Sequence, residues 1–85
     1  MDFIDACEHG YLDEVVSLLE HGADIHANND LALRSSAQNG HLPVVQFLLE
    51  HSADIHAEND GAFQWSAEKG HLPVVQYLLK KLHSR

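Results

Sequence analysis

This 85-residue sequence is poor in several features, and each scarcity excludes a class of protein. Cys7 is the only cysteine, so no disulfide can form within the chain, and we expect an intracellular, cytoplasmic protein. The net charge is -8, with only five lysines and arginines, and this argues against nucleic-acid binding, which depends on cations that neutralise phosphates. No apolar run approaches the roughly 20 residues of a membrane span. The acidic start, residues 1–5, lacks the apolar segment of a signal peptide.

One segment recurs along the chain at intervals of 30 positions. Residues 40–49 read GHLPVVQFLL, and residues 70–79 repeat them with a single aromatic exchanged. Residues 10–19 form a looser copy. A fixed period between about 20 and 50 residues indicates stacked repeats. We therefore divide the chain into three units, residues 1–30, 31–60 and 61–85, which build a single domain over residues 1–85.

Each unit is expected to contain a short helix, a tight turn, a longer helix and a connecting loop. Apolar residues at helical spacing predict helices over residues 2–9, 13–20, 31–39, 43–51, 62–69 and 73–83. Glycine adopts the left-handed conformation that closes a helix, so the first helices should end at Gly10, Gly40 and Gly70. The loops, residues 23–30 and 53–60, are expected to be extended, with tips rich in asparagine and aspartate. Since neither helix can bury its apolar stripe within one unit, the predicted fold is an all-α solenoid of three stacked helix-turn-helix repeats.

The second unit has the pattern Ala37-x-x-Gly40-His41-Leu42-x-Val44-Val45-x-x-Leu48-Leu49, followed by Ala53-Asp54-Ile55-His56-Ala57. This pattern resembles an ankyrin repeat, and the resemblance extends over essentially the whole chain. The resemblance implies an α-solenoid that serves as a protein-protein interaction scaffold. The unit is shorter than the usual ankyrin repeat of about 33 residues, so shortened loops without strands are expected. This 30-residue form is similar to ankyrin arrays of giant viruses and some intracellular bacteria.

Ser52 departs from this pattern, because the first unit has a glycine at the equivalent position, Gly22. A non-glycine residue in a left-handed conformation costs about 1 kcal/mol. We therefore expect a slightly strained junction at Ser52.

Eight histidines raise the alternative of a metal site. Most of them occupy equivalent positions of neighbouring units, about 10 Å apart in packed helices, whereas Zn–N distances are about 2.0–2.1 Å. The resemblance implies that His41 and His71 form structural hydrogen bonds. Cys7 lies on an apolar helix face, and Asp24 and Asp54 are periodic residues that we expect to bond their own loops. We therefore expect no enzyme, no cofactor and no metal, and keep histidine-based metal binding as a minor alternative.

The ankyrin resemblance implies a binding face made from the first helices and the loop tips. Its candidate partner-binding residues are Asn28, Asn29, Asp30, Arg34, Ser35, Gln38, Asn39, Glu58, Asn59, Asp60, Gln64, Trp65, Glu68 and Lys69. Most of these side chains are acidic or amide, so the expected partner is another protein with a basic or polar patch. Trp65 admits two interpretations, ordinary packing or contact with the partner.

A second hypothesis, from another class, is a self-associating structural module without a separate partner. Three repeats are about the minimum for such a stack, and the ends of a solenoid expose apolar surface unless they are capped. The basic turn at residues 80–85 resembles a cap, yet an acidic start and a basic end could pack head to tail. We expect a monomer, and light scattering against salt concentration separates the two hypotheses.

Overall fold

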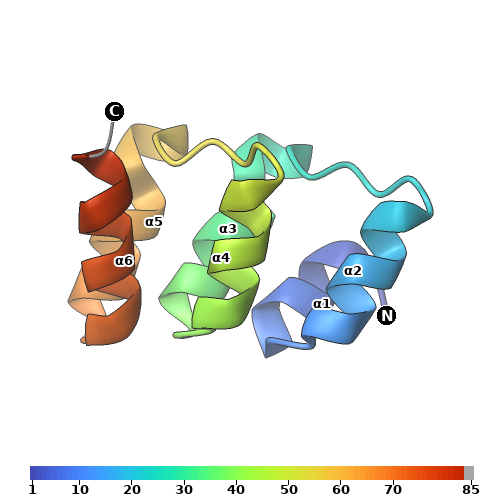
Figure 1. Cartoon of the computed structure of the whole chain (residues 1–85), viewed down its shortest axis with the longest axis horizontal. Coiled ribbons are helices and arrows are strands. Elements are labelled where there is room, and N and C mark those ends of the chain that lie inside the picture. Colours follow the sequence, from blue (N-terminus) through green and yellow to red (C-terminus); the bar gives the residue numbers. More distant parts are fainter. Residues whose placement is uncertain (84–85) are drawn as a thin grey trace.

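The computed structural model describes residues 1–83, which form three helical hairpins. The first contains α1 (Phe3–His9) and α2 (Leu12–Glu20), the second α3 (Ala27–Gln38) and α4 (Leu42–Glu50), and the third α5 (Ala57–Glu68) and α6 (Leu72–Leu82). The hairpins stand side by side, with α1, α3 and α5 in one layer and α2, α4 and α6 in the other (Figure 1). Residues 1–83 contain no strand. The predicted all-α stack of helix-turn-helix repeats is confirmed.

Each hairpin turns at a glycine, as the sequence predicts. The same left-handed φ of 76° is found at Gly10, Gly40 and Gly70. The backbone N–H of the next residue then bonds to the end of the first helix. In the second unit, for example, the His41 N–H donates to the Ser36 carbonyl at 2.9 Å. A proline lies in the first turn of α4 and of α6. In the first turn, the backbone N–H that proline lacks would have no hydrogen-bond partner within the helix.

The loop tips are not the extended segments that the sequence predicts. The helices α3 and α5 begin at Ala27 and Ala57, before the predicted starts at residues 31 and 62, because each tip winds into a left-handed turn. Three consecutive non-glycine residues of each tip have φ between 55° and 62°, namely Asn28, Asn29 and Asp30, and Glu58, Asn59 and Asp60. Asparagine and aspartate tolerate this conformation better than other side chains, which explains the composition of the tips. Right-handed helix follows from residues 31 and 61.

Ser52 adopts the left-handed backbone that its position in the repeat predicts. Its φ is 77°, compared with 99° at Gly22. In both places the chain leaves the second helix of a unit and enters the loop toward the next unit.

The core forms where neighbouring hairpins stack, and it is built from the residues that repeat. Side chains with no exposed surface include Val15, Val45 and Leu48. The third unit is different, because its copies of this stripe include Leu72 and Leu79, which are 63% and 38% exposed. No further unit covers these two residues among residues 1–83, as expected for the end of a solenoid.

Candidate functional site

The predicted partner-binding residues lie on the first helices and on the loop tips between hairpins. The exposed ones are Asn28, Asn29, Asn39, Glu58, Asn59, Gln64, Trp65, Glu68 and Lys69, and the partly exposed ones are Arg34, Ser35, Gln38 and Asp60. Asp30 differs from all the others, because only 4% of its surface is exposed.

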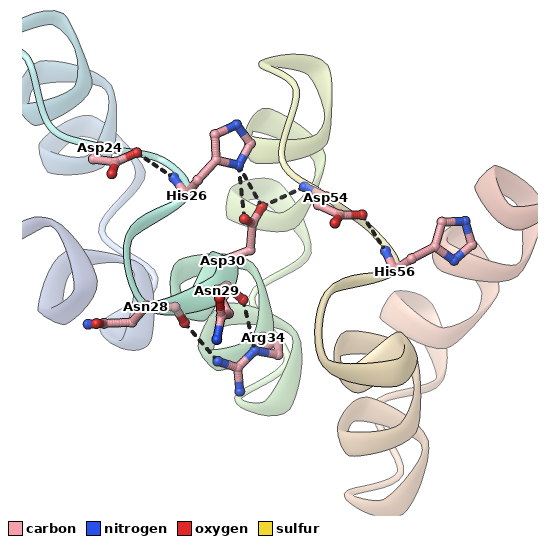
Figure 2. A network of polar contacts seen from close by, with 8 residues as sticks. All are labelled: Asp24, His26, Asn28, Asn29, Asp30, Arg34, Asp54 and His56. Carbon is pink, nitrogen blue, oxygen red and sulfur yellow. Dashed lines mark hydrogen bonds and ion pairs between the residues drawn. The ribbon is translucent and has the colours of Figure 1, made fainter.

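The buried Asp30 carboxylate joins two successive loops (Figure 2). Its two oxygens lie 2.9 and 3.1 Å from Nδ1 of His26, four residues earlier. The backbone N–H of Asp54, in the next loop, donates to Oδ2 of Asp30. Asp30 therefore holds neighbouring units together, and its side chain does not form part of the outer surface.

Asp24 and Asp54 each fold back onto their own loop, as expected from the sequence. Oδ1 of Asp24 accepts from the His26 N–H at 2.9 Å, and Oδ1 of Asp54 accepts from the His56 N–H at the same distance. These bonds fix the chain just before each left-handed turn (Figure 2).

The carbonyl groups of the left-handed tips are held by side chains from the following helix. Arg34 donates from Nη2 to the Asn28 carbonyl at 3.0 Å and from Nε to the Asn29 carbonyl at 3.3 Å (Figure 2). In the next unit, Gln64 Nε2 donates to the Asn59 carbonyl at 2.6 Å. Backbone carbonyls that are held in this way give each tip a defined shape.

The two tips also contact each other. Nδ2 of Asn29 donates to Oε1 of Glu58 at 2.8 Å, so two of the predicted binding residues are partners across the stack. Between the tips lies an open groove of about 570 Å³, lined by His26, Asn29, Asp30, Asp54, His56, Ala57, Glu58 and Asn59. Acidic and amide groups predominate in this lining.

His26 and His56 line the groove but are absent from the predicted set. His26 is exposed, and its hydrogen bond with Asp30, followed by the charges of Asp30, Asp24 and Asp54, raises its pKa above the ordinary value of 6.5. His56 pairs with Asp60 at 2.6 Å. The four-residue spacing from histidine to aspartate occurs in both loops, and it was the sequence signal that could have identified these pairs.

Four of the remaining histidines bond to backbone carbonyls through their rings, namely His9, His21, His41 and His51. His41 Nε2 donates to the Glu8 carbonyl at 2.8 Å, which confirms the structural bond expected for this residue. The His71 ring packs against Gly40, where an added Cβ would lie 2.6 Å from its Nδ1. Within residues 1–83 no three metal-binding side chains come together.

Cys7, in α1, is fully buried in the hydrophobic core. Desolvation raises the pKa of its thiol from 9.0 to about 12. The thiolate, which is the nucleophilic form, is therefore strongly disfavoured in the folded protein.

Among the residues that the structure describes, no helix has the length and apolar character to cross a membrane. A comparison with protein families matches residues 3–84 to ankyrin repeats in three copies. Ankyrin repeats generally mediate contacts between proteins and form a non-enzymatic fold. No curated protein matches the sequence. Because the family match spans nearly the whole chain and the structure has the same three stacked hairpins, the chain belongs to the ankyrin repeat family.

Proposed function

We propose that this chain binds another protein through the face formed by α1, α3, α5 and the two loop tips. One observation carries the proposal: at most equivalent positions on this face the side chains are accessible and differ between the units. Ser35 corresponds to Trp65, and Asn39 to Lys69. The stacking positions are instead repeated almost without change. Constant scaffold and variable surface are the arrangement that a recognition module requires.

Trp65 supports this interpretation of the face. Its side chain is 45% exposed on α5, so much of the indole is available for contact. Tryptophan is enriched among the few residues that dominate binding energy in protein interfaces. We therefore favour partner contact over simple packing for Trp65.

The chemistry of the face suggests the kind of partner. Glu58 and Glu68 are exposed, and the groove between the tips is lined by further acidic and amide groups. A complementary patch would be basic or polar, and its charges would mainly increase the association rate and orient the complex. The bonds that fix the tips in shape would reduce the entropy lost on binding.

We propose that residues 1–30, 31–60 and 61–85 act as one domain without catalytic activity or cofactor, in the cytoplasm. Asp30 is left out of the proposed contact surface because its carboxylate is buried and already bonded on both sides.

The test uses a partner captured on the immobilised full chain and then purified. Its dissociation constant is measured for the wild type and for a variant with glycine at Asn28, Asn29, Glu58 and Asn59. Glycine adopts positive φ without penalty, so the backbone of the tips is retained while the side chains are removed. We expect binding to weaken by about tenfold or more.

A matched control carries Glu20→Ala and Glu50→Ala, two exposed residues at the ends of α2 and α4. Its affinity should remain within about twofold of the wild type, because these positions lie outside the proposed face. Unchanged affinity of the folded glycine variant would refute the proposal.

A further inference from the structure

The second and third units present nearly the same apolar residues toward the C-terminal end of the stack. In the second unit they are buried or partly buried, and they comprise Leu33, Ala37, Gly40, Leu42, Val45 and Leu49. The equivalent residues of the third unit form what we call the terminal face: Phe63, Ala67, Gly70, Leu72, Val75 and Leu79. Every member of this face is more exposed than its counterpart, and Ala67 is exposed where Ala37 is fully buried.

The terminal face also retains the turn that receives a histidine elsewhere in the stack. The ring of His41 packs on Gly10, and the ring of His71 packs on Gly40, so closely that an added Cβ would clash. Gly70 has the same φ of 76°, yet no atom of residues 1–83 lies within 4 Å of the position that an added Cβ would occupy. The backbone at Gly70 is therefore shaped for the same ring from one further unit.

The opposite end of the stack is built differently, with polar residues at positions that are apolar in the other units. Glu14 stands where Val44 and Val74 are buried, and Ser17 stands where the later units have Phe47 and Tyr77. Both polar residues are exposed. Polar substitution of this kind is how terminal repeats adapt to solvent, and the terminal face lacks it.

These polar residues argue against a second copy of the chain as the occupant. Head-to-tail stacking would bury the Glu14 carboxylate against apolar side chains, and desolvation of an unpaired charge is costly. It would also place Tyr11, not a histidine, at Gly70. If two copies packed through their terminal faces, the Gly70 turn of one copy would face the Gly70 turn of the other. Neither turn would then receive a histidine ring.

The course of α6 does not lead into a following unit in the way that α2 and α4 do. The helices α2 and α4 end before left-handed residues, Gly22 and Ser52, which direct the chain into a loop and the next unit. The equivalent residue of the third unit, Leu82, is still within α6, and His83 beyond it has φ of -95°. The loop entry that leads from one unit to the next is therefore missing here.

We infer that the terminal face docks a helical hairpin of the ankyrin type that is supplied by a separate polypeptide. The required hairpin has a histidine after its turn glycine and valine where Glu14 stands in this chain. Exposed Lys69 and Lys80, next to Gly70 and Leu79, favour acidic residues at the margin of that hairpin. This contact uses a surface different from the face proposed above, and it would extend the stack by one unit.

The probe is a full-length donor variant of this chain whose N-terminal end imitates that of the second unit. It carries Tyr11→His, Glu14→Val and Ser17→Phe, and its own terminal face is blocked by Leu72→Glu and Leu79→Glu. The wild type serves as the acceptor. Sedimentation velocity of the mixture should show a one-to-one complex at micromolar concentrations, whereas each protein alone sediments as a monomer.

Two acceptor variants decide whether the terminal face is responsible. An acceptor with Leu72→Glu and Leu79→Glu should bind the donor at least about tenfold more weakly. A control acceptor with Asn28→Asp and Asn39→Asp gains the same two negative charges on the face formed by α1, α3, α5 and the loop tips. It should bind the donor like the wild type. Absence of a complex with the folded donor, or equal binding by both acceptors, would overturn the inference.

Circular dichroism first checks that the donor is folded. If the donor is unfolded, a milder version that carries only Tyr11→His and Glu14→Val with the same block replaces it, and its failure to bind would equally overturn the inference. The glycine variant of the loop tips serves as an additional acceptor. It should bind the donor normally, so that failure of the proposed partner face and failure of the terminal face give different results.

Discussion

His41 in the second unit donates a hydrogen bond from Nε2 to the carbonyl oxygen of Glu8 in the first, at 2.8 Å. To reach that carbonyl, the imidazole lies directly against the backbone of Gly10. The glycine thus has two roles, because it supplies a left-handed turn within one unit and leaves space for a ring from the next. The same turn occurs at Gly70, where no ring from the described part of the chain packs against it.

Gly10→Ala and Gly70→Ala separate these two roles. Both positions have φ of 76°, so alanine meets the same backbone penalty at each. At Gly10 the new Cβ would also lie 2.5 Å from Nδ1 of His41. We expect Gly10→Ala to lower the free energy of unfolding by about 1–3 kcal/mol more than Gly70→Ala, as overpacking does. Urea denaturation measures both, and equal losses would show that the His41 contact is unimportant.

Asp30→Ala and Asp60→Ala form a second matched pair. Both residues have left-handed φ, at 59° and 62°, so the backbone cost of alanine is similar. Their side chains differ, with exposed fractions of 6% for Asp30 and 45% for Asp60. Loss of Asp30 leaves the Asp54 N–H without its acceptor, and we expect about 1–3 kcal/mol more destabilisation than for Asp60→Ala. A comparable effect of both substitutions in urea denaturation would contradict the bridging role of Asp30.

Stability should depend on pH through His26. Its folded pKa is raised above 6.5, chiefly by the hydrogen bond and charge of Asp30, so the folded state binds this proton more tightly than the unfolded state. The resulting stabilisation is fully present below about pH 6.5 and is lost as pH rises through the folded pKa. Urea midpoints measured between roughly pH 5 and 8 should therefore fall more steeply for the wild type than for His26→Gln. Identical pH profiles of the two proteins would disprove this coupling.

Cys7 should be inert while the protein is folded. A pKa near 12 in place of 9.0 reduces the thiolate fraction at about pH 8 by roughly a thousandfold, and burial further blocks access. Alkylation by iodoacetamide, followed by mass spectrometry, should be very slow in buffer and rapid in concentrated urea. Rapid labelling of the native protein would mean that the first unit opens readily.

The helices and their order could be predicted because they depend on local signals that recur. Gly40 and Pro43 mark a helix end and a helix start, and the apolar stripe between units is repeated at fixed offsets. These features follow from residues close in sequence. Their physical basis is the same in every unit.

The inward position of Asp30 could not be predicted in this way. Its acceptor role depends on the Asp54 N–H, 24 residues later, which approaches only after the units have stacked. The left-handed conformation of the tips could not be predicted for a similar reason. It is fixed by bonds such as that from Arg34 to the Asn28 carbonyl, which form only in the folded chain. An asparagine-rich segment indicates a turn but does not reveal that three successive residues share positive φ.

The difference between the two ends of the stack was visible in the sequence only in part. Glu14 and Ser17 at valine and aromatic positions mark a polar end. At the opposite end the basic turn resembles a cap, but its residues 84 and 85 lie outside the described part of the chain, and Leu72 and Leu79 are exposed. Which side of each helix meets the next unit became clear only when exposure was compared between equivalent residues.

A partner protein bound on α1, α3, α5 and the loop tips would protect the backbone amides of that face from exchange. Amide hydrogen exchange of the full chain, measured with and without the purified partner, locates the protected residues. We predict that slowed exchange will concentrate in residues 28–39 and 58–69. Slowing confined to residues 12–20 and 42–50, in α2 and α4, would show that the partner binds elsewhere, because those helices form the other layer.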